Sequence, residues 1–271
     1  YFMKAKNLWK VLFVAMMSLV LLAACGSEDS EEASGEGEKN ALEQIKESGT
    51  MVFGVKNDTR LFGLKNPSTG DIEGFDIDIA NEIAKGIIGE DAKVELKEVT
   101  SKTRIPLLQN GEIDAIVATM TITEERKEQV EFSDVYFEAG QSLLVKKGSP
   151  IKSIDDINSN TKVIAVKGST SAQNIREKTD AQVMEFENYA EAFTALKAGQ
   201  GDTLTTDNSI LFGMADEDPN YEVVGGTFTD EPYGIAAKKG ETELAKEINR
   251  VLAEIKENGT YDEIYSKWIK G

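Results

Sequence analysis

Arg126 follows a predicted strand by a few residues and lies where a helix should begin. Thr123 is a good N-cap, and the two glutamates after it suit the positive end of a helix dipole. As the third helical residue, Arg126 is a cation in that same field, which typically costs about 0.3–1 kcal/mol unless an anion offsets it. A guanidinium beside Thr121 and the first helix amides makes a bidentate carboxylate site. The alternative is that Arg126 pairs with a local acid such as Glu125 or Asp134.

Two more patterns at strand ends carry possible chemistry. The segment KGSTSAQNIRE (167–177) places a glycine turn and three hydroxyl side chains at the start of a predicted helix. Amides and hydroxyls in such a turn either bind an anion or only cap the helix. Asp207, just past the predicted strand 202–206, either caps the next helix or holds an ammonium group. A carboxylate site and an ammonium site together predict an α-amino acid ligand.

The composition argues against several other functions. The chain has 271 residues, no histidine and one cysteine. The commonest general base and the usual transition-metal ligand are therefore missing, and we predict no metal site. Neither GxxxxGK[ST] nor GxGxxG occurs, so no nucleotide cofactor is predicted. A formal net charge of −18 opposes binding to the phosphate backbone of nucleic acids.

Residues 1–24 have the pattern of a signal peptide. Three lysines precede the uncharged run 11–24, whose 14 residues reach about 21 Å as a helix, short of the ~30 Å hydrocarbon core. A cleavable signal is therefore favoured over a spanning helix. The small residues before Cys25 and Gly26 after it resemble the lipobox of bacterial lipoproteins, which implies lipidation of Cys25. The alternative is a buried or incidental thiol.

Residues 25–40 are rich in acids and have no large apolar side chain. This composition predicts a flexible tether. Loss of residues 1–24 would remove three of the 30 basic residues and none of the 48 acidic ones, leaving a net charge of −21.

From residue 41 onward, short β-branched runs alternate with helical patterns, which predicts an α/β fold with largely parallel sheets. In the predicted helix 74–87, apolar residues four apart share one face. The other predicted helices are 241–257 and 260–269, and the predicted strands are 51–55, 94–99, 113–118, 162–166, 181–186 and 202–206.

A weak internal repeat supports two similar α/β lobes. LLQNGEIDAIVAT, with Gly111 and Asp114, matches ALKAGQGDTLTTD, with Gly199 and Asp202. Each reads as a helix, a glycine at its C-terminus and a strand opened by an aspartate. The alternative is that such turns are common in α/β proteins. In folds of this class ligands bind beyond the carboxyl ends of the strands, where all three patterns described above lie.

Three longer blocks resemble the extracytoplasmic solute-binding proteins that serve polar amino acid ABC transporters. They are GFDIDIANEIAKGI, GEIDAIVATMTITEERKEQVEFSDVYFEAG and FENYAEAFTALKAGQGDTLTTDNSIL. The resemblance implies a type II periplasmic-binding-protein fold, with the ligand between two lobes. Lobe 1 would comprise 41–143 and 232–271, lobe 2 would comprise 144–231, and the hinge strands would fall near 140–147 and 230–239.

The same resemblance implies roles for individual residues. Arg126 would bind the α-carboxylate with Thr121 and Thr119 beside it, and Asp207 would bind the ammonium group. Ser169 and Thr170 would be the carboxylate contacts of lobe 2.

The chain departs from some relatives, which stack an aromatic ring on the ligand where this sequence has Ser101. Phe62 is the remaining aromatic candidate, and it could equally belong to the core.

Ligand identity depends on the side-chain end of the site. Arg104 at the start of a short helix could meet the carboxylate of glutamate or aspartate, bond the amide oxygen of glutamine, or face solvent. The stretch 56–60, KNDTR, would approach the same side chain of the ligand, with Asp58 able to accept from an amide NH2 group. Segments such as GVKNDTRLFGLKNP are most similar to Gram-positive glutamine- or glutamate/aspartate-binding lipoproteins, and we favour glutamine.

The sequence therefore predicts a monomeric, non-enzymatic binding protein, anchored outside the membrane by lipid, that delivers an amino acid to an ABC transporter permease. One alternative is an enzyme on the same scaffold, similar to cyclohexadienyl or arogenate dehydratases. The other is a ligand-sensing receptor module.

Overall fold

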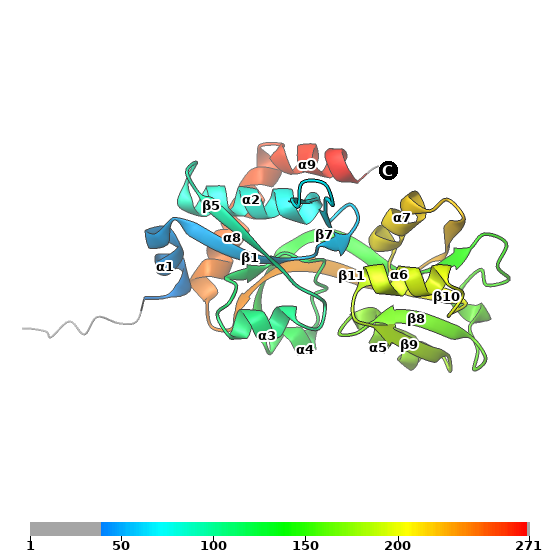
Figure 1. Cartoon of the computed structure of the whole chain (residues 1–271). Helices are drawn as coiled ribbons and strands as arrows, with labels where there is room; N and C mark the ends of the chain where they lie inside the picture. Colours follow the sequence, from blue (N-terminus) through cyan, green and yellow to red (C-terminus); the bar gives the residue numbers. More distant parts are fainter. Residues whose placement is uncertain (1–38, 270–271) are drawn as a thin grey trace, which may run out of the picture. The chain divides into compact units, whose positions relative to one another are not determined.

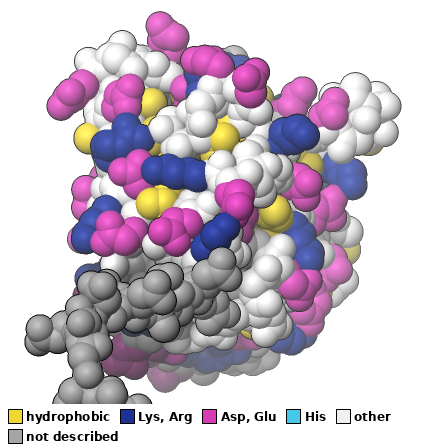
Figure 2. All heavy atoms as spheres, turned by 90° about the vertical axis from the view of Figure 1, so that its left-hand side faces the viewer, with side chains coloured by type: hydrophobic (Ala, Val, Ile, Leu, Met, Phe, Trp, Pro, Cys, Tyr) yellow, Lys and Arg dark blue, Asp and Glu magenta, His cyan; other side chains and the backbone are white. Residues whose placement is uncertain are grey.

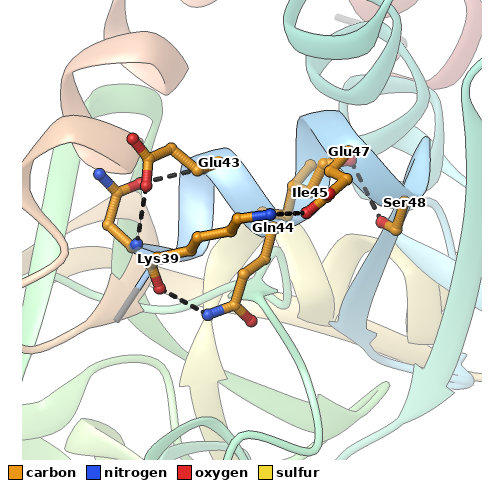
Figure 3. Close-up of polar contacts among 7 residues, drawn as sticks. Lys39, Glu43, Gln44, Ile45, Glu47 and Ser48 are labelled. Carbon is orange, nitrogen blue, oxygen red and sulfur yellow. Dashed lines mark hydrogen bonds and ion pairs between the residues drawn. The ribbon is translucent and has the colours of Figure 1, made fainter. Parts of the chain in front are cut away.

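The computed structural model describes residues 39–269. The predicted signal peptide, Cys25 and all but the last two residues of the predicted tether lie outside the described residues. The first helix, α1 (Ala41–Ser48), begins with a capping box, in which the Glu43 amide donates to the Asn40 side chain and the Asn40 amide donates to Glu43. In Figure 3 the Lys39 side chain reaches along α1 to Glu47, and the Gln44 side chain donates to the Lys39 carbonyl. These polar contacts connect Lys39, just before the helix, to its middle and to its last turn.

An eight-stranded sheet runs through the fold in the order β5-β1-β6-β11-β7-β10-β8-β9. Six of its strands are short and pair in parallel with one another: β1 (Thr50–Val55), β5 (Lys93–Glu98), β6 (Ala115–Ile116), β8 (Lys162–Val166), β9 (Gln182–Phe186) and β10 (Thr203–Asp207). The central two, β7 (Val130–Lys146) and β11 (Tyr221–Lys238), are long and pair antiparallel. A small second sheet holds β2 (Asp58–Thr59), β3 (Gly63–Lys65) and β4 (Ile72–Glu73).

Helices complete the α/β arrangement. Figure 1 shows α2 near β1 and β5, with α8 and α9 beside α2, and α5, α6 and α7 near β8 and β10. Their bounds are α2 (Phe75–Ile88), α3 (Arg104–Gln109), α4 (Glu124–Lys127), α5 (Thr170–Lys178), α6 (Tyr189–Lys197), α7 (Asn208–Glu217), α8 (Thr242–Glu257) and α9 (Thr260–Trp268), with a 3-10 turn η1 (Ile154–Asp156).

Among the described residues, buried apolar side chains form four clusters, which fall into two groups of two by their position in the chain. The first, here called the terminal core, draws on residues 41–139 and 233–269. The second, the central core, draws on residues 143–228. Only β7 and β11, among the described strands, contribute to both: Phe137 and Tyr233 pack in the terminal core, whereas Leu144 and Val223 pack in the central one.

The periodic elements are confirmed with small changes in their ends. Helix α2 begins and ends one residue later than predicted, and α8 and α9 match their predicted ranges within one residue. The strand predicted at 113–118 is paired regularly only over 115–116, but the amides of Asp114 and Val117 still donate to β1 carbonyls on either side. The apolar run is buried as expected, since it lies between two strands of the sheet.

The internal repeat is a repeated turn with the same hydrogen bonds at both sites. Gly111 and Gly199 have φ of 74° and 73°, a left-handed conformation that glycine adopts without strain. The amide of Asp114 donates to the Val52 carbonyl and the amide of Asp202 donates to the Lys162 carbonyl, both at 2.8 Å. Each aspartate also accepts from the amide of that same partner, at 2.7 Å and 2.8 Å. Each aspartate therefore fixes the start of the neighbouring parallel strand.

The surface carries many charges of both signs. On the face shown in Figure 2, acidic and basic side chains are interspersed, and hydrophobic side chains appear only in small patches. Among residues 39–269, no helix has the length and apolar character needed to cross a membrane.

Candidate ligand-binding site

Six charged side chains are buried in the described part of the chain. Arg126 is the most exposed of them at 8%, and the others are Lys56, Asp76, Arg104, Asp207 and Glu231. Three are cations and three are anions. A buried charge is costly unless it is paired or well hydrogen-bonded, so a cluster of six calls for a functional reason.

Arg126 joins segments from both halves of the fold. Its Nη1 donates to the Thr121 carbonyl at 2.7 Å, and its Nη2 donates to the Gly168 carbonyl at 3.1 Å. Thr123 is the N-cap as predicted, and its Oγ1 accepts from the Arg126 amide. No acid forms an ion pair with Arg126 in the described residues, so the local-pairing alternative is not what the structure has. Burial lowers the pKa of Arg126, and Asp207 and Glu231 act against that shift.

Gly168 makes this approach possible. It has φ of +76°, and a Cβ on it would lie 2.8 Å from the Lys102 Cα. Only glycine lets the turn before α5 come this close to the segment before α3. The predicted glycine turn therefore brings the two halves of the fold into contact beside Arg126.

Arg104 is buried, which excludes the alternative that it faces solvent. Its Nη1 donates to the Ala118 carbonyl at 2.7 Å, and burial followed by the charge of Arg126 lowers its pKa to about 9. Thr119, next along the chain, has φ of +46°. A left-handed backbone is a genuine outlier for a β-branched residue, and such strain is concentrated at functional sites.

Asp207 lies at the N-cap position of α7 but does not cap it. Its side chain makes no capping hydrogen bond. Instead, its Oδ2 accepts from the Tyr233 hydroxyl at 2.6 Å. Burial, and then the nearby charge of Glu231, raises the pKa of Asp207 to about 7. The alternative of a simple N-cap therefore does not describe this aspartate.

Lys56 follows the end of β1 and is 1% exposed. Its Nζ donates to Ser101 Oγ at 2.9 Å and lies 5.0 Å from the centre of the Tyr189 ring, a cation–π distance. Burial and the charge of Arg104 lower its pKa to about 7. Asp76, in the first turn of α2, accepts from the Thr119 amide at 2.9 Å and from a tyrosine hydroxyl. Burial raises the pKa of Asp76 to about 7.

Glu231 accepts three hydrogen bonds from neutral groups. Its Oε2 accepts from Thr170 Oγ1 at 2.6 Å, and its Oε1 accepts from Asn174 and Thr229, both at 2.8 Å. Ser169 is the N-cap of α5: its Oγ accepts from the Ala172 amide and donates to a carbonyl. Of the two predicted carboxylate contacts in this turn, one hydroxyl therefore caps the helix and the other binds Glu231.

None of the six buried charges has an ion pair within 4.0 Å among residues 39–269. All of them are nevertheless coupled electrostatically. Arg126 lowers the pKa of Asp207, Arg104 lowers those of Lys56 and Asp76, and Glu231 raises that of Asp207. The six charges thus form one electrostatic site whose members are held by neutral partners.

Two predicted site residues lie apart from this arrangement. Phe62 is fully buried in the terminal core, with its ring centre 5.1 Å from that of Phe137. It is a core residue that supports Tyr233. Asp58 directs its carboxylate to the first amides of α6, accepting from Tyr189 at 2.7 Å. It connects the small sheet to α6.

Four buried side-chain polar atoms in the described residues lack a hydrogen-bond partner there. Three belong to predicted site residues: Arg104 Nε, Thr119 Oγ1 and Asp207 Oδ1. The fourth is Ser171 Oγ, in the glycine turn segment. Buried polar groups are almost always satisfied in proteins, so unpartnered groups on three predicted site residues are consistent with a polar ligand.

A cavity of about 590 Å³ is lined by Ser101, Arg126, Ser169 and Thr170 among others, and Arg126 is the one buried charge among the described residues of its lining. Another, of about 560 Å³, lies between Leu64, Phe212 and Trp268 and contains none of the six buried charges. We place the site at the first cavity, since Arg126 and the glycine turn with Ser169 and Thr170 line it. No group of three or more potential metal ligands occurs in the described residues.

Sequence reasoning did not identify Asp76 or Glu231 as members of the site, and it included Lys56 only as the first residue of the stretch 56–60. Two signals were available. Asp76 is spaced three and four residues from apolar members of the buried face of α2, where a solvated acid does not belong. Glu231 has the same strand parity as Tyr233 and Ile235, which point into the terminal core.

The arrangement is suited to binding a molecule that carries both charges. Arg126 offers a guanidinium to a carboxylate, and Asp207 offers a free oxygen to an ammonium group. Arg104 and Lys56 supply further donors.

Comparisons with known proteins identify the family of the chain. The chain is 67% identical over 267 residues to the ABC transporter glutamine-binding protein GlnH of Bacillus subtilis (strain 168), covering 98% of both chains. It is 58% identical to a glutamine-binding protein of Geobacillus stearothermophilus, covering 91% of this chain and 99% of that one. The solved structure of an ancestral arginine-binding protein bound to glutamine is 45% identical with a TM-score of 0.76, covering 82% of this chain and 98% of that one. Residues 51–271 match the model of the bacterial extracellular solute-binding proteins, family 3, and the chain belongs to this family.

Proposed function

We propose that this protein binds extracellular L-glutamine and delivers it to the membrane permease of an ABC transporter. One observation carries the proposal: Arg126 and Asp207 are buried, oppositely charged, electrostatically coupled and not paired with each other. An α-amino acid supplies the two missing partners, a carboxylate for Arg126 and an ammonium group for Asp207 Oδ1. The side-chain amide would then lie towards Arg104 and Lys56, which offer hydrogen-bond donors.

Glutamine is favoured over glutamate and aspartate by two relatives. The Bacillus and Geobacillus proteins, at 67% and 58% identity, are glutamine-binding proteins by name, whereas a glutamate-binding relative from Corynebacterium efficiens is 34% identical. The names of these relatives describe binding proteins. They therefore support a binder over the dehydratase alternative and over a sensing module.

The binding motion is proposed to be closure of two lobes, 41–143 with 232–271 and 144–231, about hinges near 140–147 and 230–239. The separation of apolar side chains into a terminal and a central core supports this division. Contacts such as that of Arg126 with Gly168 and that of Asp58 with α6 would form on closure.

The family description places the protein outside the cell, and we propose a lipid anchor at Cys25 and a monomeric state. The lipobox-like sequence around Cys25 supports the anchor. Labelled palmitate should be incorporated by the wild type and not by Cys25→Ser, and globomycin should block processing. A wild type without label would contradict the anchor.

A thermal-shift screen over the common amino acids tests the ligand. A ligand that binds only the folded state stabilises it by RT ln(1 + [L]/Kd), about 2.7 kcal/mol at 100 times Kd. We expect the largest shift with glutamine, smaller shifts with glutamate and aspartate, and none with leucine or lysine. A flat profile over the panel would contradict the proposal.

A further inference from the structure

The six buried charges also bear on which amino acid is accepted, provided that the proposed function is correct. Their formal sum is zero, since Lys56, Arg104 and Arg126 face Asp76, Asp207 and Glu231. A zwitterion with an uncharged side chain leaves that sum unchanged. Glutamate would add one negative charge and arginine one positive charge, each without a buried counter-charge.

We propose that this buried charge balance selects the net charge of the ligand, and that Glu231 is a specificity-determining residue within it. Glu231 is suited to act through charge, because both of its oxygens already accept hydrogen bonds from Thr170, Thr229 and Asn174. It is 2% exposed and has no ion pair among residues 39–269, so its field acts on the site and is little screened by water.

Because the site is buried, one added unit of charge should have a strong effect on ligand affinity. Burial is the largest cause of the pKa changes at Lys56, Asp76 and Asp207, and in each case it favours the neutral form. A site with this property resists any further unbalanced charge. Asp58 lies at the margin: it is partly exposed and accepts from the first amides of α6, and its charge raises the pKa of Lys56 against the effect of burial.

The test is the ratio of glutamate to glutamine affinity, measured by calorimetry at one pH and ionic strength. Glu231→Gln keeps the shape of the side chain and leaves an excess of one positive charge. The glutamate-to-glutamine affinity ratio should rise at least about tenfold, equivalent to about 1.4 kcal/mol. A loss of ammonium binding or a shifted helix would weaken both ligands together and would leave the ratio unchanged.

Lys56→Met changes the balance in the opposite direction. The glutamate-to-glutamine affinity ratio should then fall by a similar factor. Opposite changes of this ratio in the two variants distinguish an effect of charge balance from a general disruption of the site. Should Glu231→Gln fail to fold, a ratio for Lys56→Met within twofold of the wild type would overturn the proposal.

Glu124→Gln is the matched control. Glu124 lies in α4 with Arg126, but its side chain is 90% exposed. Removing this charge should leave the ratio within twofold of the wild type. The proposal is overturned if Glu231→Gln binds glutamine with an unchanged ratio, or if the exposed control changes the ratio as much. A wild type that binds no amino acid would instead contradict the proposed function.

Discussion

Charges on the surface and charges in the interior of this protein are arranged in opposite ways. The described residues contain fifteen ion pairs, and every side chain in them is at least 24% exposed. The six buried charges have none, and carbonyls, amides and hydroxyls hold them instead.

The difference favours a role in binding over a role in stability for the six buried charges. Exposed pairs contribute about 0–1 kcal/mol each, so the surface pairs stabilise the fold little. The interior is where pairing would matter most, and there it is missing. Positions that hold opposite charges apart, at fixed places, are what a zwitterionic ligand needs.

The largest expected effect comes from Arg126→Ala. Truncating one member of a buried charge pair typically costs about 2–5 kcal/mol in binding, so the thermal shift should disappear for every amino acid. The free energy of unfolding of the ligand-free protein should fall by less than the binding free energy does. The partners of Arg126 among the described residues are carbonyls, so its removal deprives no anion there of an ion-pair partner. Calorimetric titration measures the loss of binding free energy, and urea unfolding measures the loss of stability.

Arg250→Ala is the control on the surface. Arg250 is exposed and pairs with Glu247 and Glu254, and its removal should leave glutamine affinity unchanged. If Arg126→Ala destabilised the ligand-free protein as much as it weakened binding, the buried charges would be structural after all.

The second effect is an unusual dependence of stability on pH. Burial raises the pKa values of Asp76 and Asp207 to about 7, so the folded protein binds more protons than the unfolded chain between about pH 4 and 7. Stability therefore falls as the pH rises through that range. The pKa of Lys56 is lowered to about 7, so the unfolded chain binds more protons between about pH 7 and 10.5, and stability rises again.

Urea unfolding of the ligand-free protein at pH 5, 7 and 9 should therefore give the lowest free energy of unfolding near pH 7. The difference from the values at pH 5 and pH 9 should be at most a few kcal/mol. Asp207→Asn should reduce the fall below pH 7, and Lys56→Met should reduce the rise above it. A stability maximum at neutral pH in the wild type would contradict the depth of burial of these groups.

The sequence predicts elements better than it predicts the site. The helix α2 follows from apolar residues four apart, and the repeated turns follow from a glycine and an aspartate at fixed spacing, since both signals are local. Arg126 and Asp207 could be proposed as site residues because strand ends meet at one edge of a sheet. Phe62 could not be assigned between core and pocket, because that choice depends on Phe137 and Tyr233, far away in sequence.

Glu231 shows more clearly what cannot be predicted from the sequence. Strand parity indicates that it points inward, but its effect depends on Thr170 and Asn174 in a distant helix and on five other charges. A balance of charges is a property of the folded interior, and no single motif in the chain records it.

The smallest expected effect is at the surface pair of Arg60 and Asp216. Arg60 Nε lies 3.1 Å from Asp216 Oδ2, and the pair joins the segment after β2 to α7, across the two proposed lobes. The side chains are 41% and 65% exposed, so water and salt screen the attraction. Asp216→Asn should weaken glutamine binding less than about fivefold, or about 1 kcal/mol, and 0.5 M salt should remove most of that difference.

A larger loss would show that exposed pairs hold the closed form together and would remove the contrast between surface and interior. The close approach of the Arg60 carbonyl to Gly213, where an added Cβ would lie at 2.9 Å, offers a separate check. Gly213→Ala keeps both charges and suits a helix, but obstructs the contact between the segments. If Gly213→Ala weakens binding more than Asp216→Asn does, the fit of the two surfaces, rather than their charges, determines how readily the cleft closes.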